Sequence, residues 1–535
     1  MSQYAEQDCR RHASLAGLRN LHEDGWREVF RYMAPERGHG FQGQVITANE
    51  AAAERARITD STAIDAARLC TSGFASGMHP ANSLWFGMDA GQESESERRW
   101  LDGAARTIFE NIHNSGFDGH AIDCLADMVL AGWFVMYIDE APNGGFSFDH
   151  WPLHQCFIAS SLPGGKVDTV FREFELSVEQ LVSEYGIDKV SSQVAEKYRL
   201  GGANYDEMVK VLWCIYPRKM YSAGGARLAK NKPFASMHYE LATKHELRES
   251  GYDEFPCAVP RWRLIPGSVY ATGLASDALP DIKILNDIKR LEYANLDIAV
   301  SGMYKAVDDG VLNPKTVRVG ARKIIMMASL DSMAELKSAG NFDVSFTKSE
   351  HLQASIRRMF LADQLQPQDG PQMTAEEVRV RVGLIRQQNG PIFARLTPEY
   401  LQTLVERCFA IAFRAGVLGQ PPESLANREY TIKYTSPLAR AQRMEEVSAI
   451  DAMLAGVMQH AQIDPTIIDL IDGEAAQREK AIALGVPSKM IRSTDDVTAR
   501  RKAKADAAAA QAKQDQQAQM MQKVVPGMVD SAMAA

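Results

Sequence analysis

Two groups of side chains have residue types and spacing that could support catalysis or metal binding. His120, Asp123 and Cys124 place an imidazole, a carboxylate and a thiol within about one turn of an expected helix. Residues three or four apart share a helix face for packing as readily as for catalysis. No nucleophile elbow or oxyanion-hole motif accompanies them, so we expect a packing role and predict no catalytic residue.

His150, His154 and Cys156 form the second group, because imidazole nitrogen and thiolate sulfur are ligands of zinc. No fourth ligand follows at a spacing typical of zinc sites. The pattern therefore favours structural roles for these residues, and no metal site is predicted.

Gly38, Gly40 and Gly43 match the letters of the GxGxxG phosphate-binding turn. That turn works between a strand and a helix of a βαβ unit, and the flanking residues indicate neither element. A GxxxxGK[ST] loop is missing as well. We therefore predict no cofactor and no nucleotide hydrolysis.

The overall composition is that of a folded protein without a basic excess. The chain has 535 residues, of which 45% are hydrophobic and 24% charged, and its formal net charge is -9. This length predicts several packed regions instead of one core. Because a protein that grips DNA tightly needs cations to neutralise phosphates, tight static binding of nucleic acid is not expected.

Membrane insertion, secretion and disulfide bonding are not expected either. The longest apolar run, 128–138, spans eleven residues, whereas a membrane-spanning helix needs about twenty. The first residues show no apolar stretch after a basic start, so no signal peptide is predicted. The seven cysteines are widely spaced without a CxxC pair and are predicted to be reduced core residues.

The first half of the chain predicts helices followed by antiparallel strands. Apolar residues at helical spacing indicate helices at 61–78, 95–115 and 120–133. The expected strands, joined in part by turns with proline and glycine, are 134–139, 146–151, 155–162, 167–174, 209–216 and 235–243. Ser177 and Gln180 fit a capping box that begins a short helix.

A small β-rich segment between two helices marks the second half. The helices are expected at 277–299 and 349–361, and the strand-like pieces between them are 303–307, 316–319, 323–327 and 342–346. Thr374 and Glu377 form a second capping box before a helix that Gly390-Pro391 interrupts. The remaining expected elements are helices at 397–416, 438–459, 463–471 and 477–484, a strand at 429–434, and an Ala- and Gln-rich tail.

A series of motifs follows in one order along nearly the whole chain. They are CTSGFASGMHPANSLWFGM at 70–88, RWLDGAARTIF at 99–109, GKVDTVFREF at 165–174, GYDEFPCAVPRWR at 251–263, GLASDALPDIKILN at 273–286, MTAEEVRVR at 373–381, GPIFARL at 390–396, AGVL at 415–418 and YTSPLARAQR at 434–443. This series resembles the head-to-tail connector, or portal, protein family of short-tailed bacteriophages.

The resemblance implies an α+β, multi-domain portal fold that is predominantly helical, with a β-rich clip and wing hairpins. It also implies a ring, usually of twelve subunits. The implied domains are the N-terminal wing 1–275, stem helix 276–300, clip 301–347, second stem helix 348–363, channel loop 364–373, wing helices and strand 374–436, crown 437–495, and a C-terminal barrel helix or tail 496–535.

The implied function is a ring at one capsid vertex through which double-stranded DNA is packaged and ejected. The implied partners are other copies of the chain, the major capsid protein, the scaffold, the terminase large subunit and the tail adaptor. The implied location is the virion, after assembly in the host cytoplasm and without a membrane.

A channel that passes DNA must not hold it, because each phosphate neutralised by Lys or Arg adds affinity. We therefore predict that Gln and Asp residues in the 364–372 loop touch the duplex weakly through backbone contacts, without reading bases. The loop residues are Gln364, Gln366, Gln368, Asp369 and Gln372.

Two alternatives remain beside the portal hypothesis. One is another structural protein of the virion, such as a tail adaptor or a scaffold, which need not form a ring with a central hole. The other is a hydrolytic enzyme of host entry, which would lose activity when His120 or Cys124 is changed.

Overall fold

The chain divides into two compact units in a computed structural model. Unit 1 comprises Met1–Ser83 and Glu110–Ala415, and unit 2 comprises Leu84–Phe109 and Gly416–Ala535. The described residues are 3–38, 41, 48–89, 95–219, 228, 231–301, 304–306, 333–335, 342–365, 395–425, 431–434, 437–460, 472–483, 492, 496–511 and 514. Helices and antiparallel sheets both contribute, so the predicted α+β class is confirmed.

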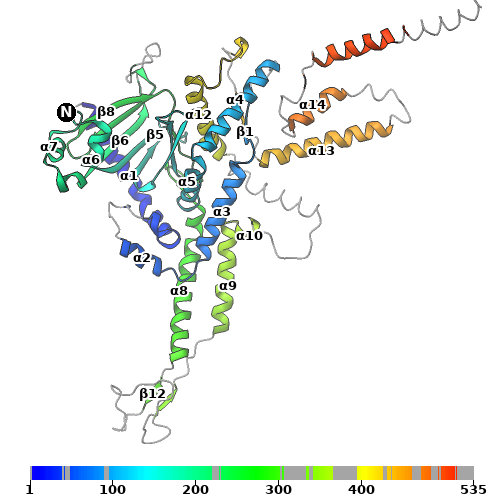
Figure 1. Ribbon diagram of the computed structural model, residues 1–535. Coiled ribbons are helices and arrows are strands. Elements are labelled where there is room, and N and C mark those ends of the chain that lie inside the picture. The colour runs from blue at the N-terminus through cyan, green and yellow to red at the C-terminus, as the bar shows by residue number, and fades with distance from the viewer. Residues whose placement is uncertain are drawn as a thin grey trace, which may run out of the picture. The chain divides into compact units, whose positions relative to one another are not determined.

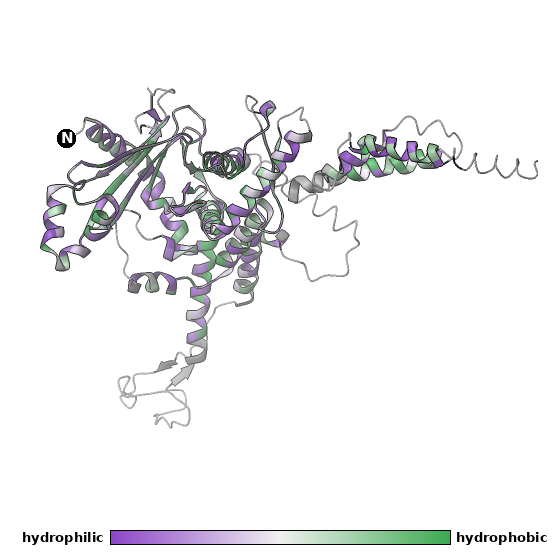
Figure 2. Ribbon diagram, turned by 45° about the horizontal axis from the view of Figure 1, so that its top comes forward, coloured by the Kyte–Doolittle hydropathy of each residue, from purple (hydrophilic) through white to green (hydrophobic). Residues whose placement is uncertain are grey.

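A five-stranded antiparallel sheet is the main layer of unit 1 (Figure 1). In spatial order its strands are β4 (Cys156–Ala159), β5 (Thr169–Ser177), β6 (Met208–Pro217), β7 (Phe234–Glu240) and β8 (His245–Tyr252). Figure 2 shows hydrophobic residues along these strands. The predicted strands 155–162, 167–174, 209–216 and 235–243 are confirmed with shifted ends, whereas β8 was not predicted.

Both faces of this sheet are covered, because successive side chains of a strand point to opposite sides. Leu212 and Cys214 belong to the core under α1 (Gln3–Met33). Val211 belongs to the core under α6 (Val178–Tyr185) and α7 (Ser192–Leu200). The sheet is therefore a central layer with one helix on one face and two on the other.

The predicted capping box at the start of α6 is present. The Ser177 side chain accepts a hydrogen bond from the Gln180 backbone N–H, and the Gln180 side chain accepts one from the Ser177 N–H. The two bonds satisfy amides that would otherwise lack partners at the helix end, so the local sequence alone defines where α6 begins.

A smaller sheet has the order β3-β2-β9. Its strands are β2 (Val135–Glu140), β3 (Phe146–Trp151) and β9 (Cys257–Ala258). The hairpin expected at 134–139 and 146–151 is confirmed by the antiparallel register of β2 and β3. The preceding helix, α5 (Phe117–Ala131), begins three residues before the predicted 120–133, because Gly116 with a φ of 73° separates it from the helix before.

Further elements of unit 1 surround these sheets. They are η1 (Pro35–Arg37), α2 (Ala48–Ala56), α3 (Thr62–Met78), η3 (Leu153–Gln155), η4 (Gly202–Asp206), β10 (Arg263–Leu264), β11 (Ala271–Thr272), α10 (Ala362–Leu365), the π-helical turn η6 (Thr397–Leu401) and α12 (Gln402–Arg414). The helices predicted at 61–78 and 397–416 are confirmed, the latter beginning as the η6 turn.

Two long helices enclose a small antiparallel sheet, as predicted. They are α8 (Leu274–Ser301) and α9 (Phe342–Met359), which lie side by side (Figure 1). Between them in sequence, β12 (Tyr304–Ala306) pairs with β13 (Met333–Glu335). The strands expected at 316–319 and 323–327 lie outside the described residues.

The expectation of a strand at 342–346 is wrong, since α9 begins at Phe342. Its alternating letters, FDVSF, resemble a strand, but a helix places Ser345 and Ser349 on one face. Both hydroxyls donate to the Glu292 carboxylate of α8. This contact between distant segments favours the helix over the local pattern.

Unit 2 contains a two-stranded sheet and helices. They are β1 (Phe86–Asp89) paired with β14 (Thr431–Tyr434), most of α4 (Glu95–Asn114), η7 (Glu423–Leu425), α13 (Pro437–His460) and α14 (Gly473–Ala483), and residues 496–511 are helical as well. The helices predicted at 95–115, 438–459 and 477–484 and the strand at 429–434 are confirmed, with α14 shifted four residues toward the N-terminus. The second capping box, the Gly390-Pro391 break and the helix at 463–471 lie outside the described residues.

Candidate stem and channel site

The predicted channel loop lies almost wholly outside the described residues. Gln364 belongs to α10, and the other loop residues, Gln366, Gln368, Asp369 and Gln372, lie beyond the described part of the chain. The structure therefore does not test whether these side chains meet DNA, but it does show how the chain enters this stretch and how it returns.

The turn that leads from α9 toward the predicted channel loop is sharp, and buried residues hold it. After α9, Phe360 is fully buried and Ala362 nearly so. Between them Leu361 has a φ of 59°, a left-handed conformation that is uncommon for a residue with a side chain. Packing on both sides holds this turn, so the start of the loop has a fixed place in unit 1.

On the far side of the predicted channel loop, a buried ion pair holds η6 in unit 1. Glu399 in η6 accepts two hydrogen bonds from the Arg261 guanidinium, Nη2 to Oε1 at 2.7 Å and Nε to Oε2 at 3.2 Å. The two side chains are only 2% and 9% exposed. A bidentate pair of this kind has a defined geometry, and it fixes the chain beside the segment that follows β9.

Arg407 makes a second link between the returning chain and the small sheet. It lies in α12 with only 3% of its side chain exposed, and it donates to Glu254 at 2.8 Å and to Asp139 at 3.3 Å. It also donates to the carbonyl of Ile138 in β2. Helix α12 is therefore tied to the small sheet through Arg407.

The contact between α8 and α9, the helices of the predicted stem, is rich in polar side chains. Glu292 of α8 accepts hydrogen bonds from Ser345 at 2.6 Å and Ser349 at 3.0 Å, and from Lys289 at 2.9 Å. Although burial opposes it, these bonds lower the pKa of the Glu292 carboxyl. The bonds from Ser345 and Ser349, one helix turn apart on α9, thus set the register of α9 against α8, while Lys289 pairs with Glu292 within α8.

Helices α8 and α9 are both tied to the residues before α3. Thr59 donates both its backbone N–H, at 2.8 Å, and its hydroxyl to Asn286 of α8. Gln353 of α9 donates to Asp60 at 2.7 Å. Both helices are therefore anchored to the same short segment of unit 1.

One side of α8 exposes large apolar side chains. Ile284 is 49% exposed and Leu291 is 61% exposed, and residues seven apart lie on the same helix face. Tyr293, Leu296 and, on α9, Phe346 are more than half exposed as well. We call Ile284 and Leu291 the stem stripe.

The residues considered for catalysis do not form an active site among the described residues. Asp123 forms an ion pair with Arg37, and Cys124 is completely buried. Burial, reinforced by the negative charges of Asp127 and Asp123, raises the pKa of the Cys124 thiol well above its ordinary value. Because the thiolate is the reactive form, Cys124 has a packing role.

The residues considered for metal binding have other partners. His150 Nε2 lies 2.7 Å from Asp127, and the backbone carbonyl of His154 accepts a hydrogen bond from Arg19. Cys156 is buried in β4, and no group of three or more metal-ligating side chains occurs in the described part of the chain. Within that part, none of the helices has the length and apolar character needed to cross a membrane.

Comparison with known proteins assigns the chain to a class. Residues 6–491 match the family described as bacteriophage head to tail connecting protein, and the chain belongs to that family. It is therefore a structural connector of the phage virion, as the series of sequence motifs predicted.

Two similar proteins cover most of the chain. The probable portal protein of Bordetella phage BPP-1 is 26% identical over 513 residues, which are 90% of this chain and 87% of that protein. The portal protein of Salmonella phage epsilon15 is 26% identical over 483 residues, 87% of this chain and 84% of that protein.

Sequence reasoning missed the residues that hold the ends of the channel loop. Arg261 and Glu399 are 138 residues apart, so no local pattern relates them. The available signal was indirect, because Arg261 lies within the 251–263 motif that contributed to the resemblance.

Proposed function

We propose that this connector is a portal: copies of the chain close into a ring, twelve in number as the family resemblance implies, and double-stranded DNA passes through its axis during packaging and ejection. The family assignment and the portal names of both relatives support this proposal. Its partners are then the major capsid protein, the scaffold, the terminase large subunit and the tail adaptor, and it assembles in the host cytoplasm.

The observation that carries the ring is the stem stripe. Ile284 and Leu291 remain exposed in the single chain, although Ile282 and Leu285 of α8 are buried and the helix packs against α9. Burying such a side chain contributes roughly 1.5–3 kcal/mol. A neighbouring copy that covers the stripe gains this free energy at each subunit contact around the ring.

The domains follow from this arrangement. The two stem helices surround the axis, the sheet between them forms the clip, and the loop at 364–373 faces the DNA. Residues 437–495 form the crown and 496–535 the C-terminal barrel helix or tail, while the rest of the chain forms the wing.

Native mass spectrometry and negative-stain images of the full-length protein test the proposal. The wild-type protein should form a closed ring with an axial opening. Leu291→Glu should shift the protein toward monomers, because it places a charge in the subunit contact, while the melting temperature of the monomer stays unchanged since the residue is exposed there.

Leu291→Met is the matched control, because it keeps an apolar side chain of similar size and should still form rings. A wild-type protein that stays monomeric under every assembly condition, or an oligomer without an axial opening, contradicts the ring. Rings that form equally well with Leu291→Glu contradict the role of the stem stripe alone.

A further inference from the structure

The proposed stem carries a second group of exposed apolar side chains beside the stem stripe. Tyr293 and Leu296 of α8 and Phe346 of α9 are each more than half exposed. Tyr293 and Leu296 are three residues apart and therefore share a helix face. We call Tyr293, Leu296 and Phe346 the stem patch. Large apolar side chains that gather on a surface mark a place that another molecule covers.

Hydrogen bonds to one segment place Tyr293 and Phe346 on the same side of the stem. Asn286 of α8 and Gln353 of α9 both bond to residues 59–60, so both face that segment. Residues seven apart lie on the same helix face. Tyr293 follows Asn286 by seven residues, and Phe346 precedes Gln353 by seven. The two aromatic side chains therefore lie on the side of the stem that carries residues 59–60.

The two helices run in opposite directions, so both steps of seven residues lead toward the same end of the stem. Asp281 accepts a hydrogen bond from Ser355 at 3.0 Å, whereas Glu292, further along α8, accepts one from Ser345, which is earlier in α9. Seven residues span about 10 Å of a helix, so both aromatic side chains lie about 10 Å beyond the segment to which their helices bond.

Leu291 of the stem stripe lies at the same level as the aromatic side chains but on another side of α8. Glu292 bonds to Ser345, so their neighbours in the chain, Leu291, Tyr293 and Phe346, are at one level along the stem. Each residue of a helix advances by about 100° around its axis, which separates Leu291 from Tyr293 by about 160°. Glu292 lies between them and faces α9. The stem therefore has an apolar surface on each side of the contact between its helices.

Two different apolar surfaces at one level match the contact that a ring requires. Ring closure by rotation joins one surface of a chain to a different surface of the next copy. A rotation about the ring axis also leaves every residue at its own level along that axis. In the proposed ring, the stem stripe of one copy therefore comes opposite the stem patch of the next.

The charged residues next to Leu291 do not oppose such a contact, because they are paired within α8. Arg290 bonds to Asp287 at 3.2 Å, and Lys289 bonds to Glu292 at 2.9 Å. A leucine side chain against tyrosine and phenylalanine rings removes apolar surface from water on both partners. The contact is therefore driven by the hydrophobic effect.

We propose that Leu291 of each copy packs against Tyr293, Leu296 and Phe346 of the next copy. This inference rests on the proposed ring and deepens it, because it names the surface that covers the stem stripe. It also makes the contact head-to-tail, so the occupant of the stem patch is a second copy of this chain.

Cross-linking of the assembled full-length protein with a short bifunctional maleimide tests the contact. The double variant Leu291→Cys with Phe346→Cys should give a ladder of linked copies on a denaturing gel, because each contact joins two different positions. Each single variant should give no linked copies, and a co-assembled mixture of the two single variants should give dimers only. The wild type, in which none of the seven cysteines is fully exposed, sets the background.

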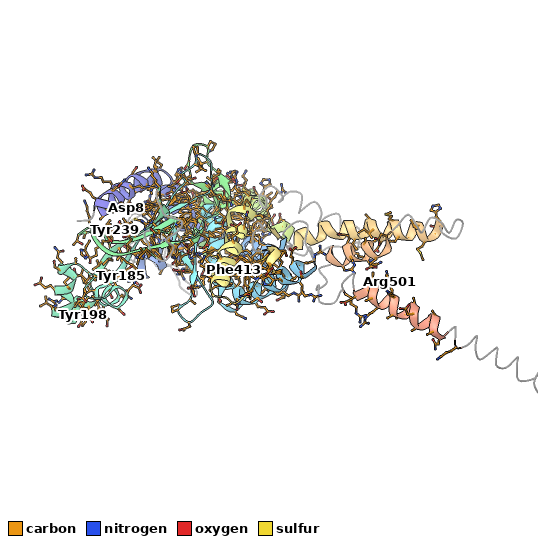
Figure 3. All side chains as sticks on the ribbon, turned by 90° about the horizontal axis from the view of Figure 1, so that it is seen from above. Asp8, Tyr185, Tyr198, Tyr239, Phe413 and Arg501 are labelled. Carbon is orange, nitrogen blue, oxygen red and sulfur yellow. The ribbon has the colours of Figure 1, made fainter. Side chains whose placement is uncertain are left out.

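Phe413 provides the matched control position. It is an aromatic residue close to half exposed, as Phe346 is more than half exposed, but it belongs to α12 (Figure 3). Leu291→Cys with Phe413→Cys should therefore give no ladder.

An exchange of charge tests the same contact without a reagent. Phe346→Lys alone should lose rings, as Leu291→Glu does, whereas Leu291→Glu combined with Phe346→Lys should regain them, because opposite charges then meet. Leu291→Glu with Phe413→Lys should stay monomeric. The melting temperatures of the Leu291→Glu and Phe346→Lys monomers should match that of the wild type, since both residues are exposed in the single chain.

Rings that give no ladder with Leu291→Cys and Phe346→Cys overturn this contact and leave the ring itself intact. Linked copies of a single variant overturn it as well, because like surfaces then meet. A wild-type protein that forms no ring is recognised before any cross-linking, by native mass spectrometry and images, and it overturns the portal proposal together with this contact. The two failures are therefore told apart.

Discussion

Arg261 shows how much a single buried charge matters in this protein. Its side chain is 2% exposed, and besides Glu399 it donates to the carbonyl of Gly165 at 2.8 Å. Removing one partner of a buried ion pair leaves the other charge without compensation, which typically costs about 3–5 kcal/mol. Arg261→Met should therefore lower the stability of unit 1 by an amount in that range.

Denaturant unfolding followed by circular dichroism measures this effect. Arg263→Met is a close control, because that arginine is 59% exposed and pairs with the half-exposed Asp277, so its loss should cost less than about 1 kcal/mol. The double variant Arg261→Met with Glu399→Leu should recover much of the lost stability. Equal midpoints for the two arginine variants would contradict the importance of the buried pair.

His238 makes the stability of unit 1 depend on pH. Burial, together with the nearby charge of Arg248, lowers the pKa of this histidine to about 3, whereas an unfolded histidine titrates near about 6.5. Between these values the unfolded chain binds the proton and the folded chain does not. The stabilising contribution is thus present above pH of about 6.5 and is lost as the pH falls toward about 3, by about 1.4 kcal/mol per unit.

The variant His238→Gln isolates this contribution. From pH 6 to pH 4 the wild type should lose roughly 2–3 kcal/mol more stability than the variant does, as measured by urea unfolding at each pH. His351→Gln serves as the control, since His351 is exposed on α9 and should leave the pH dependence as it is in the wild type. Parallel curves for the wild type and His238→Gln would sink this prediction.

Among the elements, the end of α5 is packed against β11 and the residue that precedes α8, without room for a side chain. Gly132 ends α5 with a φ of 90°, and a Cβ atom there would lie 2.2 Å from the backbone carbon of Thr272. The steric conflict and the left-handed backbone conformation both disfavour any side chain at position 132. Gly132→Ala should therefore destabilise unit 1 by more than about 2 kcal/mol.

Gly119→Ala provides the comparison within the same helix. No atom lies within 4 Å of a Cβ at this position, and alanine in a helix is favoured over glycine by about 1 kcal/mol. Thermal unfolding should show a lower melting temperature for Gly132→Ala and an unchanged or higher one for Gly119→Ala. A Gly132→Ala protein that melts like the wild type would mean that α5 and α8 can move apart.

Local signals predicted those elements whose cause is local. Pro- and Gly-containing turns indicated the β2–β3 and β4–β5 hairpins, and the Ser177 capping box indicated the start of α6. Strand β8 escaped prediction because its polar residues pair with β7 at an edge, and the early start of α9 depends on Glu292 in another helix. The ion pairs of Arg261 and Arg407 join segments over a hundred residues apart, beyond the reach of any spacing rule.

For the whole molecule, the proposed channel loop predicts that assembly and DNA handling can be separated by a deletion. Deleting residues 366–372 removes four of the five predicted loop residues but leaves both buried ends, at Phe360 and at Glu399, in place. The deletion should leave rings intact and reduce the amount of packaged or retained DNA. Both can be measured, by negative-stain images and by the DNA content of assembled particles.

A deletion of 224–230, in the segment between β6 and β7, is the matched control of equal length, and it should leave packaging unchanged. Normal genome filling after deletion of 366–372 would contradict the predicted role of the loop. Loss of rings would show instead that this segment contributes to subunit contacts.

The pairing of Arg261 with Glu399 also affects what happens during protein synthesis. The ribosome makes the guanidinium 138 residues before its carboxylate partner, so a chain that ends prematurely carries a buried cation without a counterion. A product that ends before Glu399 should therefore be less stable than the full chain. The buried pair thus makes the folding of unit 1 depend on a residue that the ribosome adds late.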